Sequence, residues 1–89
     1  MNPQQRELFR RALLEALDAN GTRFGLGVSA LRVHLGPFGF PGAATADIEA
    51  EITYLQDKAL VTEVTKQVSP ELRSWRLTAQ GRDYLATNP

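Results

Sequence analysis

The sequence contains no cysteine and a single histidine, and it has no apolar stretch approaching the ~20 residues needed to span a bilayer. Without cysteine there can be no disulfide framework, zinc ribbon or thiol nucleophile. The opening residues, MNPQQRELFRR, lack the apolar core of a secretory signal. We therefore expect a cytoplasmic protein that does not associate with a membrane.

The chain also lacks an excess of either charge. Ten Lys and Arg residues balance ten Asp and Glu residues, so binding to nucleic acid would depend on where the charges lie. A length of 89 residues with 43% hydrophobic content predicts one domain, residues 1–89, around one core.

Three helices are predicted before residue 60 from the 3.6-residue spacing of apolar side chains and from polar residues that can cap them. Their ranges are 3–20, 29–35 and 45–59. The expected N-cap residues are Asn2, Ser29 and Thr45. A short extended piece is expected over 22–26, and two prolines and three glycines predict a loop over 36–43. The inward residues of the third helix would be Ile48, Ile52, Leu55 and Ala59.

Residues 60–77 are rich in β-branched and aromatic side chains and predict a two-stranded hairpin. Trp75 and Leu77 would point to one side of the return strand and Arg76 to the other. Thr78 can cap a terminal helix over 79–86. The predicted fold class is α+β, with the element order α-β-α-α-β-β-α.

Two segments resemble a known structural junction. One is Ile52-Thr-Tyr-Leu-Gln-Asp-Lys-Ala-Leu-Val61, and the other is Trp75-Arg-Leu-Thr-Ala-Gln-Gly-Arg-Asp-Tyr-Leu85. They are similar to the segments that open and close the wing in winged helix-turn-helix regulators of bacteria and phages, PadR-like proteins among them. The resemblance implies a winged-helix fold, with the third helix in the DNA major groove and the hairpin wing on phosphates.

The resemblance predicts that the chain is a small transcriptional regulator that binds double-stranded DNA. The groove would be contacted by Thr45, Ala46, Ala50, Thr53 and Tyr54. The phosphates would be contacted by Lys66, Gln67, Arg73 and Arg76.

The third helix is acidic, which supports a second hypothesis. Residues 26–59 hold two basic and four acidic side chains, the latter being Asp47, Glu49, Glu51 and Asp57. Because non-specific DNA affinity is mainly electrostatic, these carboxylates disfavour it. The alternative is a protein–protein adaptor on the same scaffold, with little or no DNA binding.

Three apolar residues are candidates for protein contacts. Phe38 and Phe40 either plug the core or form an exposed knob for a partner or a second copy of the chain. Leu14 lies off the main apolar face of the first helix and could belong to a homodimer contact.

No residue pattern indicates catalysis or a bound cofactor. His34 has no neighbouring metal-ligand partners, and Ser29, Thr45 and Thr78 are better explained as caps than as nucleophiles. Glu49 and Glu51 diverge on a helix and make a poor acid/base pair. We therefore expect no enzymatic activity, metal or cofactor.

Overall fold

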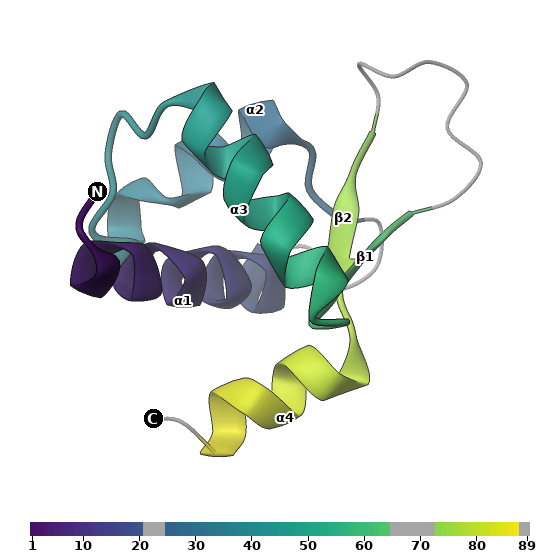
Figure 1. Cartoon of the computed structure of the whole chain (residues 1–89). Coiled ribbons are helices and arrows are strands. Elements are labelled where there is room, and N and C mark those ends of the chain that lie inside the picture. Colours follow the sequence, from purple (N-terminus) through teal and green to yellow (C-terminus); the bar gives the residue numbers. More distant parts are fainter. Residues whose placement is uncertain (21–24, 65–72, 88–89) are drawn as a thin grey trace.

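The computed structural model describes residues 1–20, 25–64 and 73–87. Within them the chain is α+β, with four α-helices, one turn of 3₁₀ helix and a two-stranded antiparallel sheet, as Figure 1 shows. The elements are α1 (Pro3–Asn20), α2 (Val28–His34), η1 (Gly36–Phe38), α3 (Thr45–Asp57), β1 (Val61–Glu63), β2 (Trp75–Leu77) and α4 (Ala79–Thr87). The predicted α+β class is confirmed, whereas the winged-helix arrangement stays a prediction.

The start of α1 is fixed by reciprocal side-chain caps. The Gln5 amide donates to Asn2 Oδ1 at 2.7 Å, and the Asn2 amide donates to Gln5 Oε1 at 3.2 Å. This pair satisfies two amides that have no partner inside the helix. The predicted Asn2 cap is therefore confirmed.

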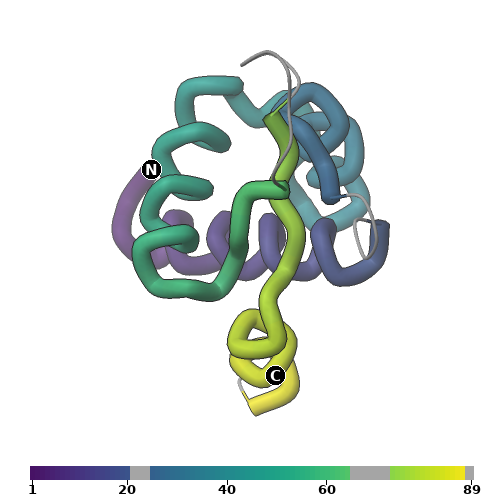
Figure 2. Tube along the Cα trace, turned by 90° about the vertical axis from the view of Figure 1, so that its right-hand side faces the viewer, coloured from purple at the N-terminus to yellow at the C-terminus, as the bar shows by residue number. Residues whose placement is uncertain are grey.

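Helix α1 is covered on more than one side. In Figures 1 and 2, α2 and α3 lie on one side of it and α4 lies on the other. Leu14, predicted as a dimer contact, is only 1% exposed and belongs to the core. That prediction is wrong because α4 and the segment after α3 cover this side of α1, where Leu14 lies beside Leu60 and Tyr84. The homodimer itself stays a prediction.

The expected strand over 22–26 is not present in its described part. Residues 22–24 lie outside the described residues, and Leu26 forms an isolated bridge with Trp75 through two backbone hydrogen bonds of 2.8 and 3.0 Å. Gly25 has a φ of +75°, and α2 begins at Val28. The left-handed turn at Gly25 and the start of α2 at Val28 leave too few residues between them for a strand to pair with β2. The observed order is therefore α1-α2-η1-α3-β1-β2-α4 instead of α-β-α-α-β-β-α.

Of the three other predicted caps, two are wrong and one is confirmed. Ser29 lies inside α2, whose N-cap is Gly27, and Thr45 is the first residue of α3, whose N-cap is Ala44. Each helix therefore begins one residue or more earlier than a side-chain cap would allow. In contrast, Thr78 Oγ1 accepts a hydrogen bond of 3.0 Å from the Gly81 amide at the start of α4.

Helix α3 ends at Asp57, two residues before the predicted end. Ala59 has a φ of +61° and is exposed instead of facing inward. The Ala59 amide donates to Gln56 O at 2.9 Å, and the Leu60 amide donates to Leu55 O at 3.0 Å. This is a Schellman C-cap with alanine in the left-handed position that glycine usually takes.

The hairpin follows the predicted alternation. Glu63 pairs with Trp75, and Val61 pairs with Leu77. Trp75 and Leu77 are buried while Arg76 is exposed, as predicted. The hairpin tip, with Lys66 and Gln67, lies outside the described residues.

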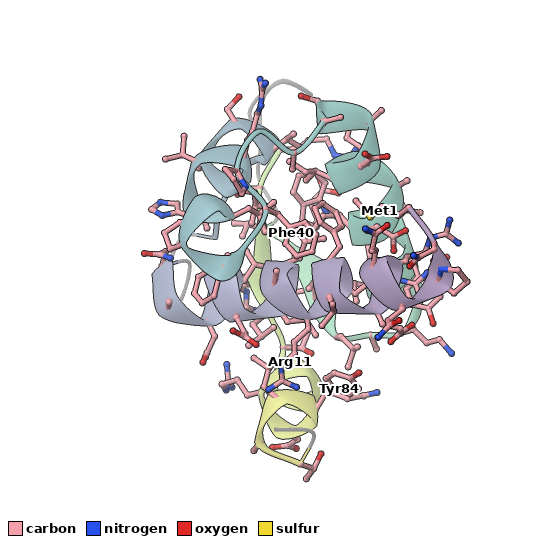
Figure 3. All side chains as sticks on the ribbon, turned by 90° about the vertical axis from the view of Figure 1, so that its left-hand side faces the viewer. Met1, Arg11, Phe40 and Tyr84 are labelled. Atoms are coloured by element: carbon pink, nitrogen blue, oxygen red, sulfur yellow. The ribbon has the colours of Figure 1, made fainter. Side chains whose placement is uncertain are left out.

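The core is formed by α1, α2, α3 and the sheet. Phe38 and Phe40 lie at its edge, partly buried against it. Phe40 contacts Phe9 edge to face, with ring centroids 5.0 Å apart, and in Figure 3 it lies above α1 within the core region. Of the two roles considered for these phenylalanines, the structure therefore favours core plugging over an exposed knob.

Candidate nucleic-acid interface

A cleft of about 480 Å³ lies between the start of α2, one side of α3 and strand β2. Its lining residues are Gly27, Val28, Ser29, Thr45, Glu49, Thr53, Arg73 and Trp75. Three of them, Thr45, Thr53 and Arg73, were predicted from the sequence as DNA contacts. Glu49 and the backbone around Gly27 are added by the structure.

The side of α3 that faces the cleft is set by the side that is buried. Ile48, Ile52 and Leu55 are at most 1% exposed and hold α3 against the core. Thr45, Glu49 and Thr53 are spaced four residues apart and therefore share another face. The Thr53 hydroxyl donates a hydrogen bond of 3.0 Å to the backbone oxygen of Glu49, one turn earlier in the same helix.

Arg73 forms the hairpin wall of the cleft. Its guanidinium donates to both carboxylate oxygens of Glu63 and lies 5.1 Å from the centre of the Trp75 ring. The hydrogen bond from Arg73 holds the pKa of Glu63 below its ordinary value. The same hydrogen bond and the charges of Glu63 and Glu49 raise the pKa of Arg73.

The hairpin is tied to α3 by its tryptophan. Trp75 is 5% exposed, and its indole Nε1 donates to Gln56 Oε1 at 3.3 Å. This contact fixes the position of β2, and hence of Arg73, relative to α3. Sequence reasoning did not single out Gln56, because nothing local relates it to a residue 19 positions away.

Tyr54 lies apart from the cleft. The Arg10 guanidinium of α1 lies 3.6 Å from the centre of its ring, and Lys58 Nζ lies 5.7 Å from it. Tyr54 is 37% exposed, and it lines a second cleft of about 280 Å³ between α1, α3 and α4. The structure therefore separates Tyr54 from Thr45 and Thr53.

Part of the negative charge of α3 is neutralised by ion pairs with α1. Glu51 accepts a hydrogen bond from Arg10 Nε and lies 3.6 Å from Arg6 Nε, so α1 neutralises it. Asp47 is in the first turn of α3, where a negative charge is favourable to the helix dipole. Glu49 and Asp57 are the two remaining carboxylates of the helix, and both are exposed.

The other predicted contacts are distributed as follows. Ala46 and Ala50 are exposed on α3. Arg76 is exposed and has no ion pair within the described segments, but strand alternation puts it on the side of β2 opposite Trp75. Lys66 and Gln67 lie in the stretch that is not described.

Within residues 1–20, 25–64 and 73–87, no group of three or more His, Asp or Glu side chains is placed to hold a metal ion. None of the helices in those ranges combines the length and apolar content that crossing a membrane requires. Comparison of the chain with protein-family models, curated proteins and solved structures found no match.

Proposed function

We propose that this chain is a winged-helix regulator that binds double-stranded DNA with α3 in the major groove and the hairpin beside it. The observation that carries the proposal is the exposed side of α3. It presents the short side chains of Thr45, Ala46, Ala50 and Thr53 around the longer side chain of Glu49, with Arg73 of the hairpin at the edge.

The dimensions of α3 suit this role. The helix has 13 residues, so it is about 20 Å long. The major groove is about 12 Å wide and admits an α-helix, and short side chains permit a close approach to the bases. In Figure 1, α3 lies in front of α2 and beside the hairpin, and no other described helix or strand covers its outer side.

The electrostatics of the site are compatible with phosphate contacts at the hairpin. Glu51 is neutralised by Arg10, so the uncompensated charge of α3 is smaller than its sequence indicates. Arg73 lines the cleft and can reach a phosphate by exchanging one hydrogen bond of its pair with Glu63, whereas Arg76 is exposed on the other side of β2.

The test is fluorescence-anisotropy titration of random duplex DNA at ~50 and ~200 mM salt, a range over which several phosphate contacts cost orders of magnitude in affinity. We expect salt-dependent binding, and Arg73→Ala should weaken it for all sequences and lower the salt slope by about one. Arg82→Ala is the matched control, because Arg82 is exposed on α4, on the other side of α1. Absence of binding at both salt concentrations, or an equal effect of both variants, would reject the proposal.

A protein partner is the second candidate function. It is favoured by the ion pairs that occupy Arg6, Arg10, Arg11 and Arg73, while Glu49 and Asp57 stay exposed on α3. In that case random DNA would not bind at either salt concentration. A basic partner would bind the wild type and lose affinity for a Glu49→Lys, Asp57→Lys double variant.

A further inference from the structure

Glu49 is the one carboxylate that lies inside the cleft at the proposed DNA-binding surface. Its side chain is exposed and forms no ion pair or hydrogen bond within the described segments. It faces the same space as Thr45, Thr53 and the guanidinium of Arg73. A carboxylate in this position is either a source of repulsion from DNA or a group that recognises a base.

We propose that Glu49 reads a cytosine in the major groove, and that it therefore sets the sequence preference of α3. The inference rests on the proposed DNA binding. An ionised carboxylate can only accept hydrogen bonds, so it needs a donor on the base edge. It loses the hydration of its charge on entering the groove, and an unmatched base would leave that loss uncompensated.

Only one base offers a donor without a competing acceptor. In the major groove guanine presents two acceptors, thymine presents an acceptor and a methyl group, and adenine presents a donor beside the acceptor N7. Cytosine presents the N4 amino group alone. A carboxylate therefore discriminates for cytosine and against the other three bases.

The position of Glu49 suits direct contact. It is the fifth of 13 residues in α3, and the N-terminal residues of a recognition helix are those that reach base edges. Arg73 lines the same cleft as Glu49, which gives the carboxylate a cationic neighbour although the Arg73 guanidinium is paired with Glu63. Asp57 lacks these features, because it is the last residue of α3 and does not line the cleft.

The experiment is enrichment of binding sites from a pool of random duplexes, performed with the wild type, Glu49→Gln and Glu49→Ala. Asp57→Asn is the matched control, because it removes the same charge from the same helix. We expect the wild type and Asp57→Asn to select a site with one fixed C·G pair. Glu49→Ala should lose that preference, and Glu49→Gln should move it to adenine, the base that glutamine pairs with.

A second readout tests the contact atom. N4-methylcytosine at the selected position keeps Watson–Crick pairing but replaces the amino hydrogen that points into the major groove. We expect this base to weaken wild-type binding roughly ten-fold and to leave Glu49→Ala binding unchanged. Circular dichroism should show that the exposed substitutions leave the fold intact.

Three results would overturn the inference. If all four chains select the same site, or if Glu49→Gln binds every sequence more tightly by the same factor, Glu49 is a repulsive charge only. In both cases the DNA-binding proposal survives. If the wild type selects no site and binds no DNA, both proposals fail.

Discussion

The carboxylate of Glu63 accepts two hydrogen bonds from Arg73, one from Nε at 3.0 Å and one from Nη2 at 2.9 Å. Glu63 ends strand β1 and pairs in register with Trp75, so Arg73 reaches it diagonally from the approach to β2. The contact joins the end of β1 to the segment that leads into β2. It also holds the guanidinium at the wall of the cleft.

This pair predicts a pH-dependent contribution to stability. The hydrogen bond from Arg73 lowers the pKa of Glu63 in the folded protein below its ordinary value of 4.5. The stabilisation is therefore fully present above pH 4.5 and is lost as the pH falls through the lower, folded-state pKa. We expect Glu63→Gln to lower the urea midpoint slightly at pH 7, since the pair is exposed and screened by solvent.

The measurement is the difference in urea midpoint between wild type and Glu63→Gln across a pH series. It should be positive at neutral pH and vanish at the lowest pH at which both chains still fold. A difference that stays constant with pH, or that grows toward acid, would show that the Arg73 contact does not stabilise the folded state.

Ala59→Gly should stabilise the protein. Ala59 occupies the left-handed C-cap of α3 with a φ of +61°, which costs an L-residue about 1–2 kcal/mol, while glycine adopts it without strain. Glycine is also more flexible in the unfolded chain, so we expect a net gain of about 0.5–1 kcal/mol in the free energy of unfolding. The single tryptophan, Trp75, is buried and provides the fluorescence signal for urea unfolding.

Ala50→Gly is the matched control, because it makes the same change at an exposed position inside α3. It should destabilise the protein by about 1 kcal/mol, since glycine is unfavourable in a helix interior. Equal signs for the two variants would contradict the left-handed C-cap.

Gly81→Ala should be destabilising although alanine favours helices. Gly81 is buried at the start of α4, and an added Cβ would meet the backbone oxygen of Leu60 and come within 2.8 Å of Leu77 Cδ1. A backbone atom cannot move aside as a side-chain end can, so α4 would shift from its place. We expect a loss of about 1–3 kcal/mol in the free energy of unfolding, in spite of the gain in helix propensity.

The comparison for this prediction is Gln80→Ala, measured by the same urea titration. Gln80 is exposed and donates one hydrogen bond of 3.3 Å to Lys58 O, so its replacement should change stability by less than about 0.5 kcal/mol. A Gly81→Ala chain as stable as the wild type would mean that α4 does not pack closely on the end of β2.

Two leucines of α1 should respond differently to truncation. Leu14 is 1% exposed, so Leu14→Ala leaves a cavity and should cost about 2–5 kcal/mol. Leu8 is 56% exposed, and Leu8→Ala should cost less than about 0.5 kcal/mol. Thermal unfolding followed by circular dichroism measures both changes in stability. Similar small losses of stability for the two variants would contradict the burial of Leu14.

Sequence reasoning located most helices and the hairpin because these elements depend on local patterns. The apolar spacing that buries Phe9, Leu13 and Leu17 is visible in the sequence, as is the alternation that buries Trp75 and exposes Arg76. Helix ends were less well predicted. Ser29 and Thr45 have the right chemistry for caps, yet α2 begins one residue before Ser29 and α3 begins at Thr45 itself, so the N-caps are Gly27 and Ala44.

The candidate site was predicted only in part. Thr45, Thr53 and Arg73 do line one cleft, but Tyr54 is held on another side of α3 by Arg10. The contact between Arg10 and Glu51 joins residues 41 positions apart, and no local pattern indicates it. The acidity of α3 therefore looked greater in the sequence than it is at the exposed surface.

By itself, the sequence determined the α+β class, the cap of α1 by Asn2, the cap of α4 by Thr78 and the inward side of β2. These features depend on residues within about one helical turn or on strand alternation, so they are encoded locally. Only the tertiary structure decided that Leu14 is core, that Glu51 is neutralised and that Glu49 lines the same cleft as Arg73. Those outcomes depend on which helix faces pack together, and that choice is made by the whole core at once.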